Sequence, residues 1–241
     1  MRIAAVNGSP RGGRGMTAWV LEAFLEGARE AKADIETIEL AGKRIHYCTG
    51  ELACWFATPG TCIHSDDMGP IVESIGAADC LVLATPVYFD GMTGLMKNFL
   101  DRLVPMADPH FELRHDHMRH PARKSAPNKL ALVSVCGFHE RDNFDPLLAH
   151  AKAIGGNMGA QFCGAVIRPA APMIPYLKLR HPLRLRSVTR AIKRAGFELA
   201  HAGRISREAE EESAAEMMPR QAFINQCNWY FDRQLGKIKG K

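Results

Sequence analysis

Residues 2–17, RIAAVNGSPRGGRGMT, decide the fold because they combine a short strand, a glycine-rich loop and the start of a helix. The apolar run at residues 3–6 is too short for a helix, and Asn7-Gly8-Ser9-Pro10 ends it. Three glycines then keep the loop backbone free, and Thr17 stands where it would cap the helix that follows. Such a loop turns backbone N–H groups toward the positive end of a helix and predicts an anion site, most often for a phosphate.

Three kinds of phosphate loop compete for this stretch, and spacing separates them. A P-loop needs Lys and then Ser or Thr after its second glycine, but no lysine precedes Lys32. A dinucleotide fingerprint is present as Gly13-x-Gly15-x-x-Ala18, yet its first glycine lies well beyond the end of the strand. We therefore expect a mononucleotide loop, in which Ser9, Thr17 and the N–H groups between them surround one terminal phosphate and Arg11 adds charge. A polar turn without a ligand remains the alternative.

The composition is that of a soluble globular protein. The chain has 241 residues, of which 46% are hydrophobic and 24% charged, and no apolar run reaches the length of a membrane span. No signal peptide is evident at the start, so we expect a cytoplasmic protein without a membrane partner. The net charge of +5 suits small anions as well as nucleic acid and alone decides nothing, and we expect no nucleic-acid partner. Seven cysteines, an odd number, favour thiols or metal ligands over a disulfide framework.

Strand and helix patterns alternate five times along residues 1–172. The alternation predicts an α/β fold with a doubly wound parallel sheet and helices on both faces. Segments 41–66 and 105–127 are irregular, and the second holds four prolines and four histidines. The expected strands are 3–6, 34–40, 79–84, 129–136 and 160–167, and the expected helices are 18–32, 71–77, 94–104 and 142–155.

A second region, residues 173–241, reads as a helical C-terminal extension. Its basic stripe, Arg180–Arg194, attracts either nicotinamide-cofactor phosphates or acidic partners, or is an ordinary solvated helix face. The aromatic end at residues 223–231 favours contact between subunits in a homo-oligomer, a dimer or tetramer, and the alternative is packing on its own domain.

The segment Thr85–Gly94, TPVYFDGMTG, is unusual for a plain connector. It joins a proline, two aromatic rings and two glycines directly after the predicted central strand. Ligands of doubly wound sheets lie beyond the carboxyl ends of the strands, which is where this segment and residues 136–139 belong. A flat heteroaromatic ligand would fit here, with Tyr88 and Phe89 bordering it.

Together, GSPR…GMT and TPVYFDGMTGLMKNFLDR resemble the recurring segments of the flavodoxin-like NAD(P)H-dependent FMN reductases. The resemblance covers roughly residues 1 to 170 and implies a flavodoxin-like, five-stranded sheet of order 2-1-3-4-5. Met16 stands where that family usually has Asn. The resemblance implies contacts with the FMN phosphate in the first loop and contacts with the flavin ring after the third strand. The residues after the fourth strand would form the third edge of the site. The phosphate contacts would come from Ser9, Arg11, Met16 and Thr17. The ring contacts would come from Pro86, Val87, Tyr88 and Phe89, with Thr93 and Gly94. The third edge would be formed by Gly137 and His139.

The cysteines of segment 41–66 resemble the cluster motif of the iron–sulfur flavoproteins. Cys48, Cys54 and Cys62 keep its order, but Glu51 stands in the place of the second cysteine. A [4Fe–4S] cluster normally takes four thiolates, and a carboxylate is a weaker ligand for its iron. We therefore expect a retained loop without a cluster.

The histidines of segment 105–127 match no standard zinc spacing. His110, His115, His117 and His120 are therefore expected in a solvated loop, or in one that covers a neighbour's site, and not at a metal.

The resemblance implies an FMN-dependent NAD(P)H oxidoreductase. Hydride would pass from nicotinamide to flavin N5, and electrons then to a quinone, free flavin, metal ion or other small acceptor. The flavin carries this chemistry, so no catalytic side chain is assigned. Gly137 or His139 are candidates to stabilise the reduced ring near N1. Two alternatives stay open: an FMN electron carrier, with or without an iron–sulfur cluster, that turns over no nicotinamide, and a non-catalytic sensor with a cysteine switch.

Overall fold

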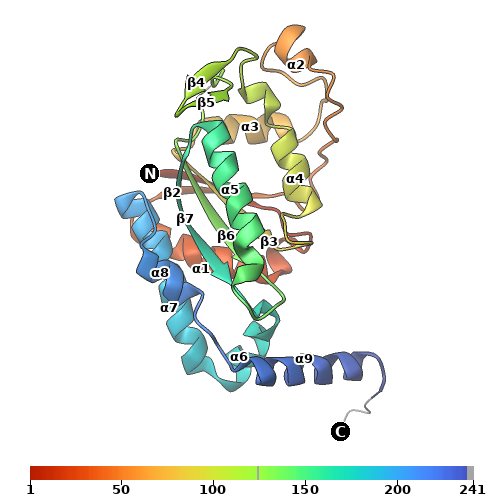
Figure 1. Cartoon of the computed structure of the whole chain (residues 1–241), viewed down its shortest axis with the longest axis vertical. Coiled ribbons are helices and arrows are strands. Elements are labelled where there is room, and N and C mark those ends of the chain that lie inside the picture. The colour runs from red at the N-terminus through yellow and green to blue at the C-terminus, as the bar shows by residue number, and fades with distance from the viewer. Residues whose placement is uncertain (124, 238–241) are drawn as a thin grey trace.

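A central sheet of five parallel strands organises the molecule, a computed structural model that describes residues 1–123 and 125–237 (Figure 1). The strand order is β2-β1-β3-β6-β7. Counting only the strands of this sheet gives the order 2-1-3-4-5, so the predicted flavodoxin-like α/β fold is confirmed. The strands are β1 (Arg2–Asn7), β2 (Asp34–Glu39), β3 (Cys80–Pro86), β6 (Lys129–Val135) and β7 (Gln161–Arg168).

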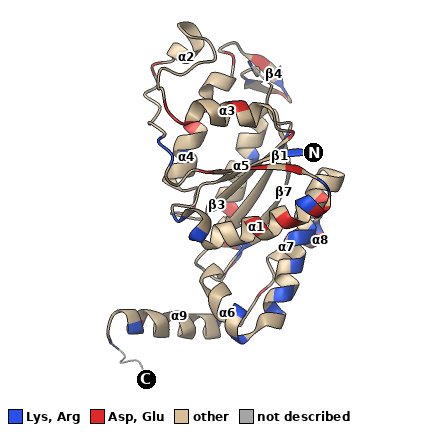
Figure 2. Cartoon of the chain, turned by 180° about the vertical axis from the view of Figure 1, so that it is seen from behind, with Lys and Arg blue, Asp and Glu red and all other residues tan. Residues whose placement is uncertain are grey.

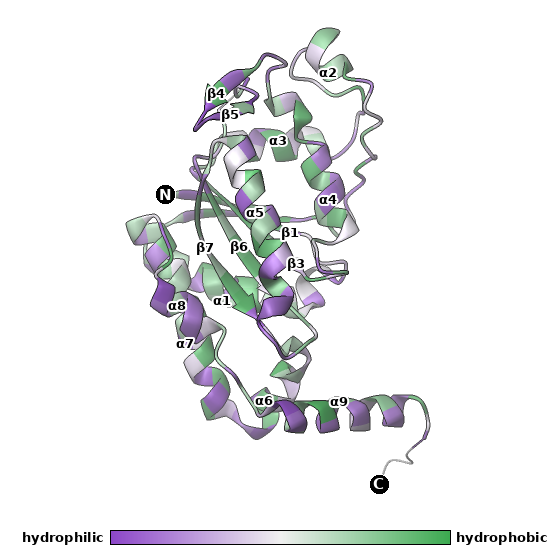
Figure 3. Cartoon of the chain, in the orientation of Figure 1, coloured by the Kyte–Doolittle hydropathy of each residue, from purple (hydrophilic) through white to green (hydrophobic). Residues whose placement is uncertain are grey.

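Helices cover both faces of the sheet because alternate residues of each strand point to opposite sides. On one face, Ile3 and Ala5 of β1 share a core with α1, α6, α7 and α8. On the other, Ala4 and Val6 share a core with α3, α4 and α5. These helices are α1 (Met16–Glu30), α3 (Met68–Gly76), α4 (Gly94–Asp101), α5 (Asp145–Met158), α6 (Ile174–Arg180), α7 (Pro182–Ala202) and α8 (Arg207–Ser213). The colouring by hydropathy shows the apolar strands enclosed between these layers (Figure 3).

Helix α7 packs closely against α1 through a pair of glycines. A Cβ atom added to Gly27 would lie 1.8 Å from the carbonyl oxygen of Lys193, and one added to Gly196 would lie 1.8 Å from that of Phe24. Only glycine permits such an approach of two helix backbones. Six apolar side chains of α7 are buried: Leu185, Val188, Ala191, Ile192, Ala195 and Leu199. The region after residue 172 therefore contributes to the sheet's own core, while the division of the chain at that residue stays a prediction.

All four expected helices differ from the sequence expectation at one boundary or both, and the differences in α1 and α4 have clear causes. Helix α1 begins at Met16 after a short 3-10 turn at residues 12–14, and Gly15 is its N-cap without a side-chain hydrogen bond. Thr17 therefore lies inside the first turn, and its predicted capping role is wrong. Helix α4 ends at Asp101, before the expected Val104, because a 3-10 turn at residues 104–106 contains Pro105.

Two small additions and one projecting helix complete the chain. The excursion predicted for 105–127 contains a two-stranded hairpin, β4 (Glu112–Arg114) and β5 (His117–Arg119), and the cysteine segment contains α2 (Ala53–Phe56). The last helix, α9 (Arg220–Gln234), extends away from the sheet (Figure 1). No helix among residues 1–123 and 125–237 is long and apolar enough to cross a bilayer.

Candidate functional site

The loop after β1 is held open by its own hydrogen bonds. The Ser9 N–H donates to Asn7 Oδ1 at 3.0 Å, and the Gly12 N–H donates to the Ser9 carbonyl at 2.9 Å. Gly12 has φ +52°, a conformation that favours glycine. The loop therefore delivers the chain into α1 with the first backbone N–H groups of that helix facing the loop, where an anion is favoured.

Helix α4 fixes this loop from the side. Thr93 caps α4 by accepting a hydrogen bond from the Met96 N–H at 3.2 Å, and its hydroxyl donates to the Gly8 carbonyl at 2.6 Å. A Cβ atom on Gly8 would lie 2.8 Å from Met96 Cβ, so the close approach needs glycine. Thr93 thus joins the segment after β3 to the loop after β1.

The ends of β3 and β6 are also tied together. The Val87 N–H donates to the Val135 carbonyl at 2.9 Å, and the Ser134 hydroxyl donates to the Thr85 carbonyl at 2.7 Å. The carboxyl ends of three neighbouring strands therefore meet at one edge of the sheet, as the sequence predicted for the ligand site.

A cavity of about 690 Å³ lies at this edge. Its volume is in the range of small-molecule and cofactor pockets. Eight of the twelve predicted site residues line it: Ser9, Arg11, Met16, Thr17, Pro86, Val87, Tyr88 and Gly137. The Ser9 and Thr17 hydroxyls and the Arg11 guanidinium lie at the end of the cavity formed by the loop after β1. Apolar and aromatic side chains lie at its other end. The arrangement suits an anion joined to a flat apolar ring.

The other four predicted residues do not line the cavity. Phe89 is fully exposed at a turn with φ +46°, and Thr93 and Gly94 begin α4. A ring nitrogen of His139 lies 2.9 Å from the Met218 carbonyl and 3.6 Å from a carboxylate oxygen of Glu216. His139 therefore contacts the C-terminal segment, and ligand contacts at these four positions stay predictions.

A second wall of the cavity comes from the C-terminal region, and sequence reasoning did not assign it. Residues of the turn after β7 and of α6 contribute one part, and α9 contributes the rest. The sequence favours subunit contact for the aromatic end, with packing on its own domain as the alternative, and does not indicate that this end borders the cavity. The wall consists of Ala171, Pro172, Met173, Pro175, Tyr176, Gln226, Cys227, Tyr230 and Phe231.

Arg168 anchors this wall and is almost completely buried. Its guanidinium donates to the carbonyls of Ser213 and Ala215, each at 2.7 Å, between α8 and α9. Burial, together with the charge of Arg141, lowers the pKa of Arg168 to about 10. The group remains charged at neutral pH and ties the segment before α9 to the end of β7.

Cys136, beside Gly137, is one of two thiols that line the cavity, and Cys227 of α9 is the other. Burial raises the pKa of Cys136 above the usual range of a thiol. At neutral pH the group is therefore a neutral part of the wall and not a thiolate nucleophile.

The cysteine loop, residues 48–64, borders a separate small site that shares no lining residue with the cavity. Cys48, Glu51, Cys54, Cys62 and His64 border a space of only about 10 Å³. Burial, with the neighbouring thiols and Glu51, raises the pKa of Cys54. All seven cysteines of the chain are free.

An iron–sulfur cluster fits this loop poorly. Cys48, Cys54 and Cys62 border one space together with Glu51, and three thiols with one carboxylate are one thiolate short of the usual four. Within the described chain no three His, Cys, Asp or Glu side chains converge as metal ligands, and this includes the histidines of segment 105–127.

A buried ion pair supports the cysteine loop. Arg102, which ends the NFLDR motif, donates to Asp66 at 2.7 Å and to the His46 carbonyl at 2.7 Å. Burial alone would raise the pKa of Asp66, but hydrogen bonds from Arg102 and from the N–H groups of His46 and Met68 outweigh it and lower the pKa to about 2. This part of the motif therefore has a structural role.

Comparison with known proteins adds to this geometry. The family model described as NADPH-dependent FMN reductase matches residues 1–159. An iron–sulfur flavoprotein of Archaeoglobus fulgidus is 33% identical over 105 residues, which cover 44% of this chain and 46% of that protein. The Bacillus subtilis protein YwqN is 30% identical over 168 residues, which cover 69% of this chain and 84% of YwqN. The chain thus spans about half the length of the iron–sulfur flavoproteins that it matches.

A solved structure supports the fold. The NAD(P)H:quinone oxidoreductase from Methanothermobacter marburgensis superposes with a TM-score of 0.60 at 20% identity and covers 83% of this chain and 98% of its own. At this identity the likeness concerns the fold alone.

Proposed function

The chain belongs to the NADPH-dependent FMN reductase family, and from that membership we propose that it is an FMN-dependent NAD(P)H oxidoreductase. The observation that carries the proposal is the cavity itself, in which an anion-binding loop and a ring-sized apolar wall face one another. When bound, FMN accepts hydride at N5 from reduced nicotinamide and passes electrons to a second substrate.

The loop end would hold the phosphate. The hydroxyls of Ser9 and Thr17 and the first N–H groups of α1 surround one position, and the Arg11 guanidinium adds a positive charge. Met16 stands where the family usually has Asn and adds no hydrogen-bond donor. Backbone N–H groups would therefore take the place of the Asn amide.

The ring end would hold the isoalloxazine. Pro86, Val87 and Tyr88 form one border, and Gly137 leaves space at the end of β6 because it has no side chain. Tyr230 and Phe231 of α9 lie across the cavity from the loop and restrict what reaches the ring. A planar acceptor such as a quinone or a free flavin would stack there between aromatic groups.

We further propose that α9 contacts a second copy of the chain. Its aromatic side chains Trp229, Tyr230 and Phe231 are 45%, 52% and 54% exposed, and Leu235 is 68% exposed. A projecting helix with such a surface is typical of subunit interfaces. Sedimentation velocity would report the oligomer, and an unchanged monomer at high concentration would contradict it.

The test of the function begins with the visible absorption spectrum of the purified protein, where flavin bands are expected. Steady-state oxidation of NADPH and NADH is then measured with ferricyanide, a quinone and free FMN as acceptors. Turnover with either nicotinamide supports the reductase. A tightly bound flavin without nicotinamide turnover would instead support the electron carrier, and a colourless protein that takes up no FMN would contradict both.

A further inference from the structure

The corner between α6 and α7 exposes two leucines among basic side chains. Leu179 and Leu183, four residues apart on either side of the turn at His181, are 79% and 75% exposed. Lys178, Arg180, Arg186 and Arg190 surround them, and each is exposed. We refer to these six residues as the corner patch.

The positive charge of the corner patch is largely uncompensated. The sequence contains no acidic residue between Asp145 and Glu198. Farther along α7, Lys193 pairs with Glu26, and Arg194 pairs with three glutamates. Among the residues that the structure describes, the four cations of the corner patch have no carboxylate within salt-bridge distance. Basic side chains accordingly follow one another along α7 (Figure 2).

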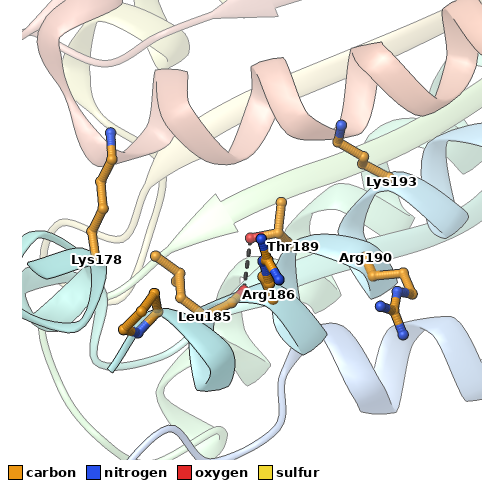
Figure 4. Close-up of a pocket in the computed structure, with 7 residues that line it drawn as sticks. Lys178, Leu185, Arg186, Thr189, Arg190 and Lys193 are labelled. Carbon is orange, nitrogen blue, oxygen red and sulfur yellow. Dashed lines mark hydrogen bonds between the residues drawn. The ribbon is translucent and has the colours of Figure 1, made fainter. Parts of the chain in front are cut away.

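A shallow groove beside the corner patch is lined by three of its four cations, Lys178, Arg186 and Arg190, together with Lys193. It has a volume of about 470 Å³, and Pro182 and Leu185 lie among its lining residues. Figure 4 shows Lys178 and Lys193 at opposite sides of the view with Arg186 between them, and Arg190 beside Lys193 with its guanidinium pointing the other way. A groove of this kind has the charge and size to receive a phosphate-bearing headgroup.

Although the sequence analysis expected no membrane partner, we infer that the corner patch docks on the surface of an anionic phospholipid bilayer. Leu179 and Leu183 enter the boundary between headgroups and acyl chains, while the four cations contact lipid phosphates and the groove receives one headgroup. Each basic residue near an anionic surface contributes about 1 kcal/mol, and stable surface binding needs both an apolar and an electrostatic component. The corner patch supplies both, and the binding is peripheral and reversible.

The composition of the patch favours lipid over the other polyanions. Nucleic acid would pair with the cations but would leave the two exposed leucines in water. An acidic protein would need an apolar pocket that matches two leucines. A bilayer accepts both kinds of side chain without a preformed partner surface.

The test uses the full chain, as purified, with vesicles of phosphatidylcholine that contain or lack phosphatidylglycerol. Co-sedimentation is expected with the anionic vesicles only, and it should weaken as the salt concentration rises. The variant K178Q/R186Q/R190Q should lose about two orders of magnitude in partitioning, at about fivefold per cation. Its matched control, K43Q/K152Q/R207Q, removes the same charge elsewhere on the surface and should retain binding.

The leucines are tested separately. L179S/L183S should lose at least about tenfold in partitioning while its net charge, melting temperature and flavin content stay those of the parent chain. The salt dependence of the unaltered chain gives a readout that needs no variant.

Four outcomes would overturn the inference. The first is equal sedimentation with neutral and anionic vesicles. The second is an equal loss in the control triple variant, because net charge alone would then explain binding. The third is binding of inorganic pyrophosphate without vesicle binding. The fourth is capture of single-stranded DNA or polyglutamate, but not of vesicles.

Discussion

Thr17 lies in the first turn of α1, where the hydroxyl borders the cavity and the helix presents its free N–H groups. Replacing it with Glu places a second negative charge beside the proposed phosphate position. Because like charges brought together cost several kcal/mol, the variant should bind FMN at least about 100-fold more weakly. Flavin content after gel filtration and a titration with FMN measure this.

The control for that variant is Thr61→Glu, at an exposed threonine of the cysteine loop, which should keep its flavin. Undiminished FMN binding by Thr17→Glu would place the anion elsewhere.

Asp66 makes the stability of the chain sensitive to acid. Its pKa is about 2 in the folded protein and 3.8 without these contacts, so its contribution is complete above about pH 4 and is lost as the pH falls toward 2. The difference corresponds to about 2 kcal/mol of unfolding free energy. Urea unfolding between pH 2 and pH 7 measures it.

Asp66→Asn should flatten that pH dependence and should also destabilise the protein at pH 7, because Arg102 is left buried without its carboxylate. Asp116→Asn, at an exposed hairpin position, is the control. An unchanged slope in the Asp66 variant would show that other carboxyl groups cause the acid sensitivity.

Glu51 distinguishes this cysteine loop from a four-thiolate motif. Glu51→Cys supplies the missing ligand, so anaerobic reconstitution with iron and sulfide should give the variant bound iron and absorbance beyond the flavin bands. The parent chain and Glu73→Cys, at an exposed glutamate of α3, should gain neither. Iron bound stoichiometrically by the parent chain would contradict the argument from thiolate number.

At the scale of the elements, the contact between α1 and α7 depends on Gly27. Gly27→Ala forces its Cβ into the Lys193 carbonyl and should cost about 3 kcal/mol of unfolding free energy. Gly156→Ala, in the exposed part of α5 where nothing lies within 4 Å, should instead stabilise by about 1 kcal/mol. Thermal unfolding of the two variants tests the pair, and equal effects would mean that α7 can move away from α1 without loss.

The elements also show what a sequence can and cannot predict. Apolar runs and glycine-rich loops are local signals, so the five strands, the loop after β1 and the segment Pro86–Tyr88 were placed correctly. The fit of Gly27 against α7 depends on residues far apart in the chain, and hydrophobic periodicity carries no information on it. The same holds for Arg168, whose partners are backbone carbonyls that have no sequence signature.

For the molecule as a whole, the cavity is complete only when its C-terminal wall is in place. Arg168→Ala leaves the carbonyls of Ser213 and Ala215 without their donor, at about 1–3 kcal/mol for each buried group. Residues 213–219, which contain no lysine or arginine but two methionines, should then be cleaved faster by thermolysin, and FMN should bind about tenfold more weakly. Arg207→Ala, at an exposed arginine of α8, should change neither.

The position of α9 also explains why the sequence could not decide between subunit contact and packing on its own domain for the aromatic end. Phe231 lines the cavity and is still 54% exposed, so one helix serves both the site and the outer surface. A pattern of aromatic residues cannot distinguish these two roles when the helix has apolar side chains around its whole circumference.

The pairing of residues 9–17 with residues 226–231 in one cavity has a consequence for biosynthesis. The ribosome releases the anion-binding loop early and α9 much later, after an interval on the order of ten seconds or more. During that interval a growing polypeptide has the loop but lacks the opposite wall. Tight retention of the coloured prosthetic group should therefore begin only after translation has passed Phe231, and a prematurely terminated product would expose the apolar side of this cavity to water.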